Sequence, residues 1–316
     1  MKYRHIAQYV IETPWAIQRS KLDEIEAILE LHMSGGAFSA EELKARIGDP
    51  TSPGAGRRGV VAVLPLRGVI AHRMGGMTEM SGGMSTEKFA AMFREALKDD
   101  SIGAIVIDVD SPGGTIAGVT ELAAEIYAAR GIKPIVAQAN ALMASAAMWI
   151  AASAEQIVAT PSAMIGAIGV ITSHLDTSKA EEQEGVTRTV ISAGKFKSEG
   201  YGPLTEEAKA AVQARVDEAY GVMVKDIARG RGVKASDVRD GFGEGRVVSA
   251  SQAKALGMID KIATIETTVT RLLGAKSPRA ALSADWDATE LVAEDDPLAL
   301  TAASFESDLR RRIEGF

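Results

Sequence analysis

The chain has 316 residues, of which 46% are hydrophobic, with a formal net charge of −7 and no cysteine. This length and apolar content are enough to bury one core of about 200 to 250 residues and leave flanking segments. The acidic balance, with no sustained basic stripe, argues against nucleic acid as a partner. The lack of cysteine excludes disulfides, thiol catalysis and thiolate metal sites, and since no phosphate-loop or dinucleotide glycine motif occurs, we expect no cofactor and no metal.

The N-terminus shows no sign of a secretion signal or a membrane anchor. Its apolar positions are interrupted by Gln8, Glu12 and Pro14, and no apolar run of 18 residues follows. A signal peptide needs an uninterrupted apolar region, and a spanning helix needs a still longer one. We therefore expect a cytoplasmic protein without a membrane anchor.

A helical N-terminal arm is predicted over residues 1–56. Apolar residues recur near helical spacing from Leu22 to His32, and Ser39 to Glu42 reads as a capping box that opens a second helix through Ile47. Residues 48–58 are rich in Gly, Pro, Ser and Arg and have no periodicity, which predicts a linker.

The main domain is predicted over residues 57–274, where apolar runs alternate with helical patterns. Such alternation is typical of an α/β domain with a largely parallel sheet. Residues 72–85, rich in Gly and Met, predict a mobile loop. Strands are expected at 59–66, 104–109, 134–139, 156–159, 169–172 and 186–191, helices at 86–98, 116–130, 145–152 and 205–229, and a helix followed by a strand at 247–263.

The composition changes again in the last segment, residues 275–316. Between Asp285 and Asp308 there are eight acidic residues and no Lys or Arg. Segments of this kind bury too little apolar surface to fold, so we expect a flexible acidic tail.

Two glycines and a serine supply the parts of an acyl-transfer site. Gly113 and Gly114 follow an apolar strand and precede a helix, so their N–H groups are able to face an anion. Ser145 lies among alanines where a strand meets a helix, and the N–H of Ala146, together with that of Gly114, would form an oxyanion hole. The alternatives are a tight turn without a ligand and a serine that only helps a small-residue helix to pack.

A nucleophilic serine needs a base, and histidine offers one pair. Of the four histidines, His174 with Asp176 is the pair able to complete a Ser-His-Asp set. A lysine serves instead if burial lowers the pKa of its ammonium group. Lys197 has Phe196 and Tyr201 as apolar cover, with hydroxyls nearby to orient it; its alternative is an ordinary surface charge.

Four motifs stand in order between residues 59 and 263: Asp110–Gly114, Ala144–Ile150, Gly166–Val170 and Gly194–Ser198. In this order they resemble the signal peptide peptidase A family, the S49 serine peptidases of the ClpP/crotonase superfamily. The resemblance implies a repeated ββα core, Ser145 as nucleophile and Lys197 as general base, with Lys195 the weaker candidate and Ser198 or Ser192 orienting the amine. It also implies Gly114 and Ala146, and less firmly Gly113, as oxyanion donors.

The sequence departs from the family pattern at two places. Ala146 stands where the family often has glycine, and Gly166 and Ala167 stand about where ClpP carries its histidine. The second departure argues against a ClpP-type triad and makes His174 a minor alternative.

The N-terminal arm carries a second resemblance. Residues Tyr9–Ile17 and Gly36–Glu42 are similar to the opening of phage-encoded S49 peptidases, the lambda C-type capsid assembly or prohead proteases. This similarity implies a homo-oligomeric endopeptidase of the host cytoplasm or assembling procapsid that cleaves capsid, scaffold or portal proteins and itself. The alternatives are a cytosolic signal-peptide peptidase, a crotonase-like acyl-CoA enzyme and a non-catalytic assembly protein.

Overall fold

The computed structural model describes residues 10–33, 56–73, 83–274, 280 and 282, all within a compact unit that ends at Leu282. Several expected features lie outside the described residues. These are the second arm helix, most of the linker, most of the Gly/Met-rich loop and the acidic tail.

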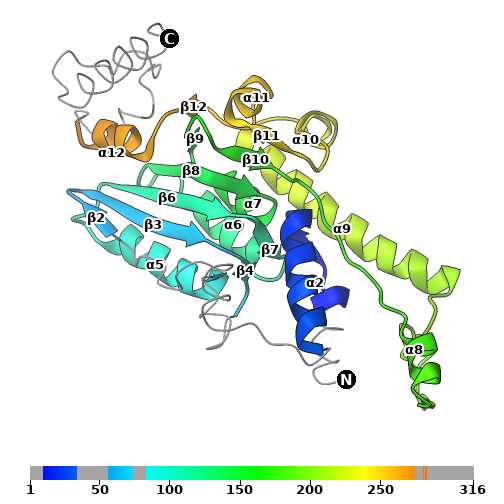
Figure 1. The fold of residues 1–316 in the computed structure, drawn as a ribbon. Coiled ribbons are helices and arrows are strands. Elements are labelled where there is room, and N and C mark those ends of the chain that lie inside the picture. The colour runs from blue at the N-terminus through cyan, green and yellow to red at the C-terminus, as the bar shows by residue number, and fades with distance from the viewer. Residues whose placement is uncertain (1–9, 34–55, 74–82, 275–279, 281, 283–316) are drawn as a thin grey trace, which may run out of the picture. The chain divides into compact units, whose positions relative to one another are not determined.

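Two sheets make up the described unit (Figure 1). The larger has the strand order β11-β10-β8-β6-β3-β2, with β9 paired to β8 and β12 paired to β9, and the smaller has the order β1-β7-β4-β5. Strands β3, β6, β8, β9 and β10 pair in parallel, which confirms the predicted α/β class with a largely parallel sheet. The strands are β1 Trp15–Ile17, β2 Gly56–Arg58, β3 Val61–Arg67, β4 Ile70–Ala71, β5 Met84–Ser85, β6 Ala104–Ser111, β7 Gly113–Thr115, β8 Ile135–Ala144, β9 Gln156–Ala159, β10 Met164–Gly166, β11 Val247–Ser249 and β12 Lys261–Ile262.

The helices agree closely with the helical sequence patterns. Helix α5 has the predicted bounds, and α2, α6, α7 and α9 begin and end within a few residues of them. Figure 1 shows α5 and α6 on one side of the larger sheet, and α12 packs across β3, β6 and β8. The helices are α2 Arg19–Met33, α5 Thr86–Lys98, α6 Val119–Ala128, α7 Ala146–Ala151, α8 Ser178–Gln183, α9 Glu206–Arg231, α10 Ala235–Gly241, α11 Ala250–Ala255 and α12 Ile265–Gly274.

Burial and capping explain why these elements form. Strand β6 is buried along nearly its whole length, as its continuous apolar run predicts for a strand covered on both faces. Helix α5 begins at Ser85, whose side chain accepts the N–H of Lys88, and it buries Phe89 and Phe93 completely. The apolar core therefore lies between the larger sheet and its helices.

Four predicted elements are corrected by the structure. Gly113 and Gly114 lie in strand β7 and not in a turn. Residues 169–172 form only an isolated bridge, between Ile171 and Trp15. Residues 186–191 are exposed and form no strand, and they pair with no strand among the described residues. Residues 247–263 begin with a short strand before α11 and β12.

The N-terminal arm contributes a strand to the main domain. Strand β1 pairs antiparallel with β7, and Leu22 of α2 is buried beside Trp15 and Ile17 in a small apolar cluster. The arm therefore touches the residues that the sequence singles out for catalysis.

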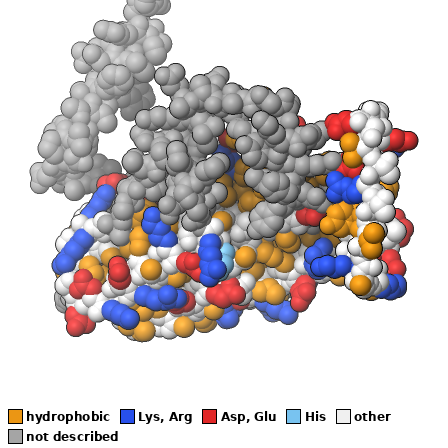
Figure 2. All heavy atoms as spheres, turned by 90° about the horizontal axis from the view of Figure 1, so that it is seen from below, with side chains coloured by type: hydrophobic (Ala, Val, Ile, Leu, Met, Phe, Trp, Pro, Cys, Tyr) orange, Lys and Arg blue, Asp and Glu red, His pale blue; other side chains and the backbone are white. Residues whose placement is uncertain are grey.

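The surface and the helices add two observations. On the face shown in Figure 2, Lys and Arg side chains are interspersed with Asp and Glu, so no large field of one sign covers it. Within the described part of the chain, every helix is too short or too polar to cross a membrane.

Candidate active site

Ser145 lies at the sharp turn between β8 and α7, where the sequence places it. Its backbone has φ 54° and ψ −115°, an unusual conformation for a residue with a side chain. Strain of this kind costs about 1–3 kcal/mol and persists where the surrounding structure enforces it, often at functional sites. A strained strand-to-helix turn is also how serine hydrolases of another fold present their nucleophile.

Two hydrogen bonds hold this turn. The N–H of Ser145 donates to the carbonyl oxygen of Gly166 at 2.7 Å, and its Oγ donates to that of Gly169 at 3.3 Å. The serine is fully buried in this conformation.

The two glycines differ in what their N–H groups do. Gly113 donates its N–H to the Oγ of Ser111 at 3.1 Å, and that hydroxyl donates to the carbonyl of Gly68 at 2.6 Å. The amide of Gly113 is therefore engaged by a residue of its own segment, whereas Gly114 is paired with Ala16 of β1.

The glycine strand lies directly beside the start of α7. A Cβ atom built on Gly113 would lie 3.0 Å from the amide nitrogen of Ala146, and one built on Gly114 would lie 1.8 Å from the carbonyl oxygen of Ile70. Ala146 is the first residue of α7, so its N–H has no acceptor within that helix. The structure thus brings together Ser145, Ala146 and both glycines, and it leaves no space for side chains at the glycines.

A cluster of polar side chains that sequence reasoning missed joins the end of β3 to the later parts of β6 and β8. Arg67 pairs with Asp108, and Asn140 donates its side-chain N–H to the same carboxylate at 3.1 Å. Partial burial raises the pKa of the neighbouring Asp110 carboxyl, and the charge of Arg67 opposes that rise. Charged residues ending adjacent parallel strands were the available signal, because such ends meet at one edge of a sheet.

The predicted lysine lies elsewhere in this chain. Lys197, Ser192 and Ser198 are exposed, in a segment that follows α8 at the outer end of α9 (Figure 1). Phe196 and Tyr201, expected to cover the amine, are 51% and 54% exposed. The Nζ of Lys195 forms an ion pair at 3.0 Å with Glu207, in the first turn of α9.

Contacts along helix α9 show how far Ser145 lies from the segment that carries Lys197. Trp149, in the helix that follows Ser145, donates its indole N–H to Asp226 at 2.9 Å, whereas Lys195 pairs with Glu207. At a rise of about 1.5 Å per residue, Glu207 and Asp226 lie about 28 Å apart along α9. Ser145 and Lys197 therefore do not meet within one chain.

The histidine alternative does not assemble either. The Nε2 of His174 lies 2.8 Å from the carbonyl oxygen of Gly202, and its Nδ1 lies 3.8 Å from the carboxylate of Glu12. Asp176 accepts the backbone N–H of Ser178, which lowers the pKa of the Asp176 carboxyl. Both ring nitrogens of His174 thus have partners away from Ser145. In the described residues, no group of His, Asp and Glu side chains is arranged to hold a metal ion.

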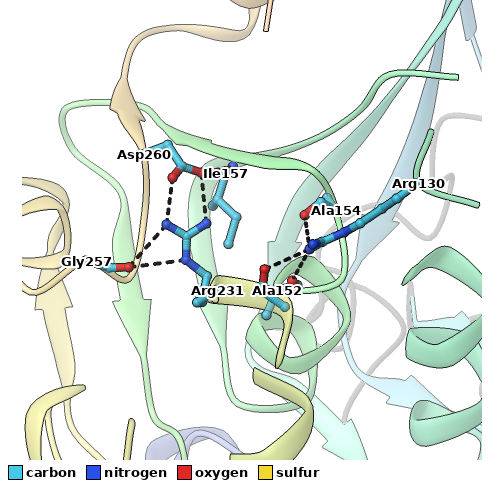
Figure 3. A network of polar contacts seen from close by, with 8 residues as sticks. Arg130, Ala152, Ala154, Ile157, Arg231, Gly257 and Asp260 are labelled. Atoms are coloured by element: carbon cyan, nitrogen blue, oxygen red, sulfur yellow. Dashed lines mark hydrogen bonds and ion pairs between the residues drawn. The ribbon is translucent and has the colours of Figure 1, made fainter. Parts of the chain in front are cut away.

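A half-buried arginine supports the end of the helix that follows Ser145. Arg130 donates to the carbonyl oxygens of Ala152, Ser153 and Ala154, and also to that of Gly230 in α9. Figure 3 shows its side chain reaching Ala152 and Ala154, with the separate ion pair of Arg231 and Asp260 beside it. Burial lowers the pKa of the Arg130 guanidinium.

Two phage proteins are among the relatives of this chain. The head-tail preconnector protein GP5 of Enterobacteria phage P21 is 34% identical over 180 residues, which cover 56% of this chain and 36% of that protein. Capsid assembly protease C of Escherichia phage lambda is 29% identical over 256 residues, covering 78% of this chain and 58% of the lambda protein. The chain therefore spans between about a third and three fifths of the length of these two relatives.

A structural comparison gives a weaker likeness. The 1510-N membrane-bound stomatin-specific protease matches with a TM-score of 0.42 and 17% identity, covering 70% of this chain and 88% of that one. So low a score supports no conclusion.

The family comparison is more direct. The model of peptidase family S49 matches residues 128–277, which include Ser145, Ala146 and Lys197. Together with the phage relatives, this match shows that residues 128–277, slightly less than half of the chain, are similar to peptidase family S49.

Proposed function

We propose that the chain is a serine endopeptidase with a Ser/Lys dyad and a ClpP/crotonase-like domain over residues 57–274. The observation that carries the proposal is the strained backbone of Ser145, at a strand-to-helix turn beside the amides of Gly114 and Ala146. A serine that only helped α7 to pack would not need this conformation. The similarity of residues 128–277 to peptidase family S49 supports it.

The residues divide the chemistry between them. Lys197, as a neutral amine, takes the proton of the Ser145 hydroxyl while Oγ bonds to the carbonyl carbon of the substrate. The N–H groups of Gly114 and Ala146 receive the resulting oxyanion, a contribution of about 3–4 kcal/mol for each donor. The tetrahedral intermediate then expels the amine of the substrate, which takes the proton from Lys197. Water activated by the same amine hydrolyses the acyl-enzyme.

Because the dyad does not form within one chain, we propose that a neighbouring copy supplies Lys197. Residues 182–199, which include Lys197 and its flanking Ser192 and Ser198, are all exposed. The segment also exposes apolar side chains, among them Ile191 at 94%. Exposed apolar groups clustered on one segment are typical of a surface that another protein covers. A homo-oligomer would both bury them and bring the amine into an apolar environment.

We propose proteins of an assembling phage head, namely capsid, scaffold or portal proteins, as substrates, with the chain itself among them. The support is that the similarity to the lambda capsid assembly protease covers 78% of this chain. On this reading the protein acts in the host cytoplasm or the procapsid.

Mixing two inactive variants tests the dyad and its sharing at once. Ser145→Ala and Lys197→Ala should each lose hydrolysis of labelled casein, while Lys195→Ala keeps it. Co-assembled in equal amounts, the two inactive variants should regain about a quarter of wild-type activity, because one site in four pairs an intact serine with an intact lysine. A mixture that stays inactive would contradict the shared site, and an active Ser145→Ala would contradict the mechanism.

The substrates are tested separately. Mass spectrometry of capsid, scaffold and portal proteins encoded beside the gene, co-expressed with wild type or with Ser145→Ala, should show cleavage only with wild type. Cleavage of secreted-protein signal peptides alone would favour the signal-peptide peptidase alternative.

A further inference from the structure

Strand β1 is held on both edges, as a bound peptide would be. On one side it pairs antiparallel with β7, in the register Trp15 with Thr115, Ala16 with Gly114 and Ile17 with Gly113. On the other side, Trp15 and Ile171 exchange two backbone hydrogen bonds of 2.7 and 2.8 Å. Extended peptides that bind proteins often use such main-chain ladders.

The pairing of β1 with β7 places the carbonyl group of Ala16 near the N–H groups of Gly114 and Ala146, the two proposed oxyanion donors. The N–H and C=O groups of Trp15 both bond to Ile171. Because the backbone groups of successive strand residues point to opposite edges, the N–H and C=O groups of Ala16 face Gly114. The position that a Cβ on Gly113 would take lies 2.2 Å from the carbonyl oxygen of Ala16 and 3.0 Å from the amide nitrogen of Ala146. The carbonyl of Ala16 thus stands beside both donors of the proposed oxyanion hole.

Strand β1 also closes the site. Ser145 and Ala16 are completely buried, and Trp15 is 7% exposed. We call the space between β7 and Ile171, which β1 fills, the peptide channel. While β1 fills this channel and Ser145 is buried, a protein substrate does not reach the serine hydroxyl.

The attachment of β1 is light enough to be reversed. Its side chains Trp15 and Ile17 pack with Leu22 in a small cluster that is separate from the main core, and β1 joins the main core only through the small side chain of Ala16. Trp15 adds one hydrogen bond, from its indole N–H to the carbonyl of Val10 at 2.7 Å. Segments with few buried contacts open at a lower free energy than the core of a protein.

We infer that residues Trp15–Ile17 are an internal pseudosubstrate, which occupies the peptide channel and keeps Ser145 inactive until a substrate or an assembly partner displaces the strand. This inference rests on the proposed function. It also assigns the channel a ligand class: an extended peptide with a small residue where the fully buried Ala16 now lies.

A reversible cross-link gives the sharpest test, since the natural chain has no cysteine. Because the backbone groups of Trp15 face Ile171, the pair Trp15 and Thr115 is not hydrogen-bonded across β1 and β7. The Cα atoms of such pairs lie about 4.5 Å apart, which a disulfide spans. The double variant Trp15→Cys/Thr115→Cys should lose casein hydrolysis on oxidation, by at least about tenfold, because the tethered strand stays at a very high effective concentration. Reduction should restore it.

The controls separate the possible failures. The single variant Thr115→Cys should not respond to oxidation, and intact mass should verify the disulfide in the double variant. Equal activity of the oxidised and reduced forms would overturn the inhibitory role while leaving the proposed protease standing. Absence of Ser145-dependent hydrolysis in every form would overturn the protease, and the inhibitory role with it.

A second pair of variants does not depend on a cross-link. Ala16→Asp places a charge in a closed space and should raise activity about three- to tenfold by expelling β1, whereas Ala27→Asp on the exposed side of α2 should leave it unchanged. A peptide with the sequence of residues 12–19 should inhibit Ala16→Asp more strongly than a scrambled peptide does. Equal inhibition by the two peptides would contradict the inference.

Discussion

Gly230 of α9 lies directly against the carbonyl oxygen of Ala152, which closes the helix after Ser145. A Cβ atom on Gly230 would lie 2.0 Å from that oxygen, a distance that real side chains do not reach. The backbones of α7 and α9 therefore approach each other at a point where glycine is required, and this contact helps to fix the turn that holds Ser145.

Two glycine substitutions on α9 should have opposite effects on stability. Gly230→Ala should lower the free energy of unfolding by about 1–3 kcal/mol, because the helices must move apart. Gly221→Ala, where the new methyl group meets nothing within 4 Å, should raise it by about 0.5–1 kcal/mol through better helix propensity. Denaturant midpoints measure both. A stabilising Gly230→Ala would show that the contact is looser than described.

Arg130 should be worth more to stability than an exposed arginine. Arg130→Met leaves four backbone carbonyls without this donor, three directly after α7 and one in α9, and should cost about 3 kcal/mol or more. Arg94→Met removes a two-bond ion pair with Glu125 at the surface and should cost clearly less, because solvent screens exposed ion pairs. Chemical denaturation of both variants checks this order, and similar losses would contradict it.

Asp226 should matter through its contact with Trp149. Asp226→Ala leaves the buried indole N–H of Trp149 without an acceptor and should lower stability by about 1–3 kcal/mol. Asp226→Asn keeps an acceptor oxygen and should lose clearly less. The exposed Asp217→Ala, on the same helix, serves as the control and should be close to neutral. Equal losses for the Ala and Asn variants at residue 226 would point to charge and not to the hydrogen bond.

The sequence predicted the inner part of the site because its signals are local. The apolar runs that become β6 and β8 end next to Gly113 and Ser145, so alternation of strand and helix was enough to place both residues at one edge of the sheet. That alternation alone did not distinguish Gly113 from Gly114, and the resemblance to the family put Gly114 first. The structure adds that the Oγ of Ser111 accepts the N–H of Gly113.

The sequence could not predict the contacts that join distant segments. Strand β1 has three residues, too few for a periodic pattern, and its partners Gly114 and Ile171 are far away in the chain. The alternation at residues 186–191 predicted a strand, but an alternating pattern does not say which chain provides the partner. For the same reason, the motif around Lys197 predicts a chemical role without predicting where that lysine lies relative to Ser145.

The backbone of Ser145 makes a prediction that needs no assay of activity. At φ 54° and ψ −115° a side chain is strained, so Ser145→Gly releases about 1–3 kcal/mol in the folded state, against about 0.4–1 kcal/mol of added entropy in the unfolded chain. Both Ser145→Gly and Ser145→Ala lose the hydrogen bond from Oγ to Gly169, so their comparison isolates the backbone. The glycine variant should be the more stable by about 1 kcal/mol in denaturant unfolding. At Ser236, within helix α10, the order should reverse, because alanine favours a helix over glycine by about 1 kcal/mol. If alanine were also the better residue at position 145, the turn would not be strained, and the main argument for a nucleophile there would fail.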